Sequence, residues 1–140
     1  MGLAALALVG VVGCGDPALE LRARSDVGVA ADDTVVLDCL GYPQVAPVEL
    51  VLGCRDRGPW VVSLRWQRWG QPTASAAGYL RLDGWGRSRA RVQLSGLTLR
   101  RDATVTYRDA TITAARVVPG WRTRRARYAL QDGALRRLGP

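Results

Sequence analysis

The side chains with which this sequence could carry out hydrolysis are four carboxylates, on Asp38, Glu49, Asp56 and Asp83. A pair of such groups can cleave a glycosidic bond as acid and base. The sequence contains no His and no Lys, which excludes Ser–His–Asp triads, Cys–His pairs, Schiff-base lysines and most zinc or iron sites. No metal and no cofactor is therefore expected. Because nothing in their spacing brings the carboxylates together, we interpret them as solvated surface acids. The chain is therefore predicted to be non-catalytic, with a hydrolase of cell-wall glycan as the alternative.

Cys14 points to a different chemistry, the attachment of lipid. Residues 1–13 are apolar and uncharged. They are too few to span a bilayer, which takes about 20 residues, but they suit the apolar region of a signal peptide. Residues 11–14, Val-Val-Gly-Cys, resemble a bacterial lipobox, in which the cysteine thiol receives a diacylglyceryl group. Two acyl chains give stable anchoring. We therefore predict cleavage before Cys14 and an extracellular domain that is lipid-anchored to the outer face of the cell membrane.

The segment before Cys14 lacks the basic residues with which a signal peptide normally begins. A start codon placed too late, downstream of a basic stretch, would explain this. The alternatives are another exported form and a buried first strand that carries an ordinary core cysteine. Residues 14–33 are predicted to be a lipidated, flexible tether that reaches roughly 25 Å. The folded domain is predicted to span residues 34–140.

The two remaining cysteines, Cys39 and Cys54, predict a disulfide in an oxidising compartment. Such a bond would contribute about 3 kcal/mol to stability. Apolar residues alternate in residues 34–39 and 48–54, and both cysteines fall on the apolar face at the downstream end of their strand. A tight antiparallel hairpin would hold those ends apart. The two strands are therefore predicted to run parallel or to lie in facing sheets, as in a β-sandwich.

The rest of the domain shows the period-two alternation of strands and no convincing helical stripe. Further strands are predicted at residues 60–67, 74–82, 89–95, 104–107, 111–118, 128–130 and 134–138. The last two are predicted to form a hairpin through Asp132 and Gly133. The sequence thus predicts an all-β fold: a single small β-sandwich-like domain with one disulfide, behind a lipoprotein signal peptide and tether.

The tryptophans divide into core and surface candidates. Trp60 and Trp66 share a strand parity with apolar neighbours and are predicted to lie in the core. Trp69 has the opposite parity, and Trp85 and Trp121 stand beside glycines in predicted loops. These three could form a stacking surface for a sugar or a peptide. The alternative is that each plugs an edge of a small core.

Arginine dominates the second half of the chain. Residues 1–80 hold six Arg and eight acids, a net charge of −2, whereas residues 81–140 hold 14 Arg and four acids, a net charge of +10. Guanidinium groups bind phosphate and carboxylate through their planar forks, and Arg89 and Arg91 share the outer face of their strand. The candidate binding surface comprises Trp69, Trp85, Trp121, Arg122, Arg124, Arg125 and Arg127. The alternative is a solvated surface set by codon usage. Nucleic acid is not expected as a partner, because the domain should lie outside the cell and carries no recognition motif.

Cysteines and tryptophans occur in a fixed order between residues 34 and 108. The motifs are Leu37-Asp-Cys39, Tyr42-Pro-Gln44, Leu50-Val-Leu-Gly-Cys54 and Trp66-Gln-Arg-Trp69-Gly70, followed by Thr104-Val-Thr-Tyr107. This pattern resembles an uncharacterised family of small exported actinobacterial proteins and lipoproteins. The resemblance implies a secreted or lipid-anchored, disulfide-bonded domain and brings no known activity. The chain departs from it at residues 83–86, where many relatives carry a second cysteine pair.

These interpretations predict a non-catalytic lipoprotein domain on the cell surface. Its partners would be the membrane, through the lipid anchor, and an anionic envelope polymer or a protein. The alternatives are the carboxylate-dependent glycan hydrolase and a structural accessory subunit of an envelope complex. An accessory subunit would show an exposed apolar patch in place of a charged one.

Overall fold

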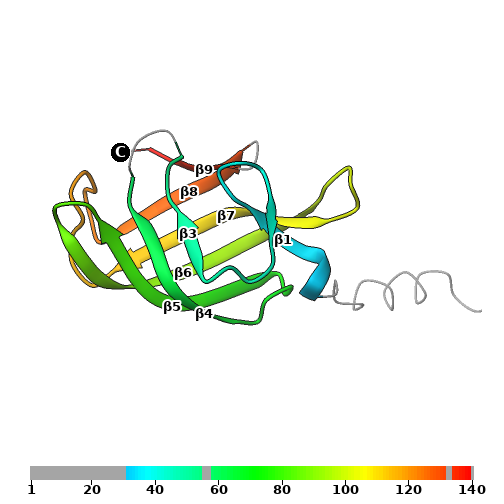
Figure 1. Ribbon diagram of the computed structural model, residues 1–140, viewed down its shortest axis with the longest axis horizontal. Coiled ribbons are helices and arrows are strands. Elements are labelled where there is room, and N and C mark those ends of the chain that lie inside the picture. The colour runs from blue at the N-terminus through cyan, green and yellow to red at the C-terminus, as the bar shows by residue number, and fades with distance from the viewer. Residues whose placement is uncertain (1–30, 55–57, 132–133, 140) are drawn as a thin grey trace, which may run out of the picture.

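One mixed sheet of nine strands forms the folded part of the chain in the structure, a computed structural model that describes residues 31–54, 58–131 and 134–139 (Figure 1). A short 3-10 helix, η1 (Ala31–Asp33), leads into it. The strands are β1 (Thr34–Leu37), β2 (Pro43–Gln44), β3 (Glu49–Val51), β4 (Trp60–Gln67), β5 (Thr73–Leu82), β6 (Gly86–Leu99), β7 (Val105–Ala114), β8 (Arg125–Gln131) and β9 (Ala134–Arg137). The predicted signal peptide, Cys14 and most of the predicted tether lie outside the described residues. Within these residues, no helix is long and apolar enough to cross a membrane.

Antiparallel hairpins connect the strands from β3 to β9 in chain order. Strand β1 departs from this order, because Thr34 and Val35 pair in parallel with Val105 and Thr106 at the start of β7. Further along, β7 pairs with β8. The predicted terminal hairpin is present as β8 and β9, and the two predicted strands within residues 104–118 are one continuous strand, β7.

A disulfide between Cys39 and Cys54 joins two distant parts of the sheet. β1 and β3 are not neighbours in the strand order, yet the Cα atoms of the two cysteines that follow them are 5.4 Å apart. Figure 1 shows β3 in front of β6 and β7, whereas β1 lies beside the start of β7, so the sheet folds back over itself. The prediction of a small all-β domain with this disulfide is confirmed, and the facing layers are two parts of one sheet.

The core fills the space inside this fold. Its most deeply buried apolar side chains come from the inward positions of five strands and one loop: Val36, Val61, Leu80, Val92, Leu94, Tyr107, Ile112 and Val118. Strand β6 shows the underlying pattern, since Ser88, Ala90, Val92 and Leu94 are buried and the residues between them are exposed. Period-two burial leaves the opposite face of β4–β8 free to carry polar side chains. We call that face the outer face.

A β-bulge interrupts β4 and corrects one prediction. The pairing between β4 and β5 shifts by one residue between Val62 and Arg65, and Ser63 adopts a positive φ of 56°. Before the bulge Val61 faces the core, and after it Leu64 does. The prediction that Trp60 and Trp66 both lie in the core is therefore wrong for Trp60, which is only partly buried and lies under the Arg81 side chain, whereas Trp66 packs against the core.

Candidate functional site

A groove of about 680 Å³ lies on the outer face of the sheet, and four arginines line it: Arg65, Arg89, Arg91 and Arg124. The other lining residues are small or uncharged: Ser63, Ala77, Gly78, Tyr79, Ala90, Thr113, Ala114 and Ala115. None of these twelve residues is acidic. We call this hollow the arginine groove. Its charge and size suit an elongated anion.

Cross-strand register aligns outward side chains in a row that crosses five strands, from β4 to β8. Arg65 on β4 pairs with Ala77 on β5, and Ala77 pairs with Arg91 on β6. Arg91 in turn pairs with Thr113 on β7, which pairs with Arg125 on β8. Arginines thus stand on alternate strands, roughly 10 Å apart, because neighbouring strands are about 4.8 Å apart. The small residues between them form the floor of the groove.

Among the residues that the structure describes, no carboxylate forms an ion pair with a groove arginine. Among the described residues the only ion pair joins Arg100 and Asp102, 3.5 Å apart, in the β6–β7 turn. Asp102 is committed to that turn, because the Thr104 side chain and backbone donate hydrogen bonds that hold its pKa below the ordinary value. The positive potential of the groove is therefore available to a ligand in solution.

A second hollow, of about 610 Å³, adjoins the arginine groove and shares Ser63 and Tyr79 with it. Both arginines that line it, Arg81 and Arg87, lie over aromatic rings. The guanidinium carbon of Arg81 is 5.6 Å from the centre of the Trp60 ring, and that of Arg87 is 4.9 Å from the centre of the Tyr79 ring. We call this region the stacked-arginine hollow.

The three tryptophans of the predicted binding surface line neither the arginine groove nor the stacked-arginine hollow. Trp69 packs on the core, donates a hydrogen bond from Nε1 to the Thr34 carbonyl oxygen (3.1 Å) and contacts Tyr107 edge-on. Trp121 is 7% exposed and packs near Tyr128. Trp85 is partly buried against the core, beneath Arg116. The prediction that these rings form an exposed stacking surface is wrong, because each one covers an edge of the small core.

The four predicted arginines, unlike the tryptophans, are exposed. Arg124 lines the arginine groove, and Arg125 ends the cross-strand row described above. Arg127 occupies the next outward position of β8, opposite Thr111, and Arg122 is exposed in the preceding loop. The predicted set omits Arg65, Arg89 and Arg91, three of the four groove arginines. Alternation along β6 already places Arg89 and Arg91 on the outer face, but only the β4 bulge and the strand register bring Arg65 beside them.

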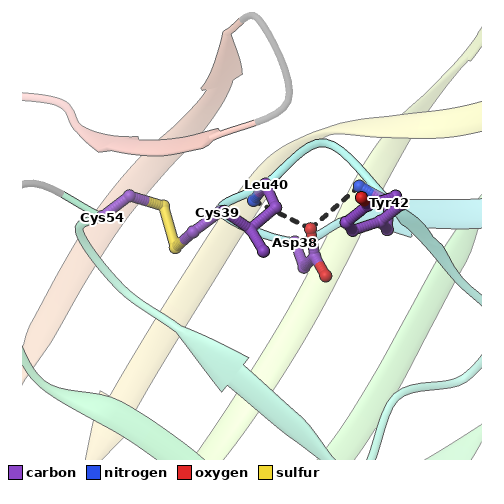
Figure 2. Close-up of a disulfide and its surroundings, with 5 residues drawn as sticks. All are labelled: Asp38, Cys39, Leu40, Tyr42 and Cys54. Atoms are coloured by element: carbon purple, nitrogen blue, oxygen red, sulfur yellow. Dashed lines mark hydrogen bonds between the residues drawn. A yellow bond between two sulfur atoms is a disulfide. The ribbon is translucent and has the colours of Figure 1, made fainter.

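The predicted carboxylates that the structure describes do not lie together. Asp38 and Glu49 line a crevice of only about 50 Å³ beside the disulfide, too small for a sugar ring. Figure 2 shows how Asp38 is used: its Oδ1 accepts hydrogen bonds from the backbone N–H groups of Leu40 (2.9 Å) and Tyr42 (2.8 Å). Asp83 is exposed in the β5–β6 turn, and Asp56 lies outside the described residues. The acids that can be placed do not form an open catalytic cleft.

Residues 31–54, 58–131 and 134–139 contain no group of three or more His, Cys, Asp or Glu side chains that could hold a metal ion. No protein-family model matches the chain, and neither a curated protein nor a solved structure matches it.

Proposed function

We propose that this chain is a non-catalytic, cell-surface lipoprotein domain that binds an anionic component of the cell envelope in the arginine groove. The observation that carries the proposal is the convergence of Arg65, Arg89, Arg91 and Arg124 on one groove in which none of the described lining residues is acidic. Guanidinium groups suit such a site, because each offers a planar fork of donors to phosphate or carboxylate oxygens.

The arrangement of the arginines favours binding over simple solubility. Solubility needs charges of both signs interspersed over a surface. Here like charges converge from β4, β6 and the residue before β8, and the small residues of the floor offer them no charged partner. Such convergence costs stability through mutual repulsion, and a multivalent anion would relieve it. A single exposed ion pair contributes only about 0–1 kcal/mol, so the proposed binding depends on several simultaneous contacts.

The proposed location depends on the sequence before the folded domain. An apolar segment that ends in a lipobox-like motif at Cys14 supports export and lipid attachment. The Cys39–Cys54 disulfide supports an oxidising compartment. An anchored domain at the outer face of the membrane would meet envelope polymers and anionic headgroups.

Co-sedimentation of the purified, oxidised full chain with isolated cell wall tests this proposal. The test variant changes Arg65, Arg89, Arg91 and Arg124 to Gln. The matched control changes four exposed arginines outside both hollows, Arg68, Arg101, Arg108 and Arg136, to Gln and has the same net charge.

We expect wild type and control to be retained at low salt and released at high salt, and the groove variant to lose at least about tenfold in retention. Equal losses in both variants would show that net charge alone attracts the chain. No retention of the wild type would also contradict the proposal.

A further inference from the structure

Arg81 and Arg87 face each other directly across β5 and β6. Like charges at directly opposed positions destabilise a sheet. Each guanidinium lies over a different ring, Arg81 over Trp60 and Arg87 over Tyr79, which offsets part of the repulsion. A pair that violates a local rule of sheet stability in this way is a mark of function.

Stacking also prepares these side chains for a ligand. A guanidinium that lies flat on a ring uses its face for the contact and leaves the N–H groups along its edge free. The ring restricts the long side chain before the ligand arrives, which lowers the entropic cost of binding. Arg81 and Arg87 are therefore preorganised anion contacts.

A third arginine, Arg116, also lies over an aromatic ring, at the end of the sheet that holds the stacked-arginine hollow. The β5–β6 hairpin and the β7–β8 connection lie at this end (Figure 1). Arg116, in that connection, lies 4.6 Å from the centre of the Trp85 ring and donates a hydrogen bond from Nη2 to the Arg87 carbonyl oxygen (2.9 Å). This contact fixes the backbone that carries Arg87 and so helps to hold the stacked-arginine hollow in shape.

The two hollows form one continuous surface. Tyr79, on β5, lines both hollows. The Arg87 guanidinium lies over its ring, and its cross-strand partner on β6 is Arg89, which lines the arginine groove. Arg87, Arg89 and Arg91 occupy successive outward positions of β6. Their backbone positions are about 7 Å apart, because two residues of a strand span that distance. A ligand could therefore follow β6 from one hollow into the other.

The spacing of these charges indicates the ligand. A covalent chain covers about 3.5 Å with every three bonds, so about six bonds span the 7 Å between successive arginines. Two phosphorus atoms joined through a three-carbon polyol are separated by six bonds. Each phosphodiester of such a chain keeps one negative charge and two free oxygens, which match a guanidinium fork.

We propose that the ligand is a linear phosphodiester polymer with short polyol linkers, which lies along β6 and contacts both the arginine groove and the stacked-arginine hollow. This inference depends on the proposed function and names its ligand. It predicts that affinity grows with chain length until the polymer spans both hollows, because the later contacts are made at high effective concentration.

Titration of the oxidised full chain with poly(glycerol phosphate) fractions of increasing length tests the proposal, with glycerol phosphate as the monomer. The test variant is Arg81→Gln with Arg87→Gln, and the groove variant Arg65→Gln, Arg89→Gln, Arg91→Gln and Arg124→Gln serves for comparison. Polyglutamate of equal charge and vesicles of phosphatidylglycerol are the competing probes. A urea unfolding curve for each variant establishes that it is folded.

We expect the Arg81/Arg87 variant to lose at least about tenfold in affinity for long polymer while its affinity for short fragments stays near that of wild type. The groove variant should lose affinity for both. Asp83→Asn removes the one acidic residue of the stacked-arginine hollow and should strengthen binding of long polymer. It provides a second test that does not depend on the folding of the arginine variants.

Equal affinity of the Arg81/Arg87 variant and wild type for long polymer would overturn this inference and leave the proposed function standing. So would an affinity that does not change with length. Tighter binding to polyglutamate or to vesicles than to poly(glycerol phosphate) would assign the surface to a different ligand and would also overturn the inference. Loss of all binding to cell wall would instead overturn the proposed function.

Discussion

A Cβ atom on Gly78 would lie 2.5 Å from the carbonyl oxygen of Val62, a separation that no side chain can adopt. This close approach lies beside the bulge at Ser63, where the register between β4 and β5 shifts, and a bulge bends its strand locally. Gly78 also lines the arginine groove, so the bulge shapes both the core and the candidate site.

Gly78→Ala should therefore lower the free energy of unfolding by about 1–3 kcal/mol, since backbone must move to admit the methyl group. Ala77→Ser is the matched control, because the neighbouring side chain is exposed and should change stability by less than about 0.5 kcal/mol. Urea unfolding of the oxidised chain measures both values. Equal midpoints for Gly78→Ala and Ala77→Ser would refute this account of the bulge.

The same bulge shows where prediction from the sequence ends. Uninterrupted alternation assigns Trp60 and Trp66 to one face, and a shift of one register position moves Trp60 out of the core. Local patterns predict the terminal hairpin and the all-β class correctly, because each depends on neighbouring residues. The disulfide was predictable for a different reason, since Cys39 and Cys54 are the two cysteines left once Cys14 is assigned to the lipobox-like motif. Trp69 is partly buried and donates a hydrogen bond to Thr34, 35 residues away, a contact that alternation along one strand does not predict.

The candidate site was predictable in the same partial way. Charge asymmetry points to arginines in residues 81–140, and alternation places Arg89 and Arg91 outward. Arg65 joins them only through the pairing of β4 with β5 and of β5 with β6. The register of three strands is a tertiary property, and short apolar runs do not determine it.

Loss of the Cys39–Cys54 disulfide should cost about 3 kcal/mol of stability, because the reduced chain regains the loop entropy of the residues between the cysteines. The measurement compares urea midpoints of the wild type with those of Cys39→Ser with Cys54→Ser. Cys14→Ser is the control and should leave the midpoint of the oxidised chain in place. A double variant as stable as the control would show that packing alone holds β1 across the sheet.

Removal of the Tyr107 hydroxyl should destabilise the fold by about 1–3 kcal/mol. That hydroxyl accepts a hydrogen bond from the buried Gly70 N–H (3.0 Å) and donates one to the Gln71 carbonyl oxygen (2.8 Å). Tyr107→Phe leaves both groups without their partner. Tyr79→Phe is the control, because no hydrogen bond of the described residues involves the Tyr79 hydroxyl. A similar small change in both variants would contradict the importance of this contact.

Thr34→Val should stabilise the protein by about 1 kcal/mol. Thr34 is fully buried, and its Oγ1 has no hydrogen-bond partner among the described residues. Valine keeps the shape of the side chain and removes the unsatisfied hydroxyl. Thr104→Val should have the opposite sign, because the Thr104 hydroxyl donates to Asp102 (2.6 Å). Unfolding midpoints that fall in both variants would show that Thr34 Oγ1 is hydrated or bonded in solution.

Stability should fall as the pH rises above about 10. Burial raises the pKa of Tyr128 and of Tyr107 above the ordinary value for tyrosine. Between that ordinary pKa and the raised one, the unfolded chain releases protons that the folded chain retains, so unfolding becomes more favourable with pH. The stabilisation is fully present below about pH 10. Thermal unfolding of wild type and Tyr128→Phe across this range measures the effect, and an equally steep fall in the variant would exclude Tyr128 as a cause.

Ligand binding should instead be independent of pH between about 6 and 9. The sequence contains no His and no Lys, and guanidinium groups stay charged in proteins, so the charge of the arginine groove does not change in this interval. Phosphodiesters also keep their charge there. Titration with poly(glycerol phosphate) at constant ionic strength measures the affinity at each pH. A change in affinity of tenfold or more across this pH interval would mean that a titrating group outside the arginine groove takes part. An affinity that does not change with pH but falls steeply with added salt is expected where both protein and ligand carry fixed charges.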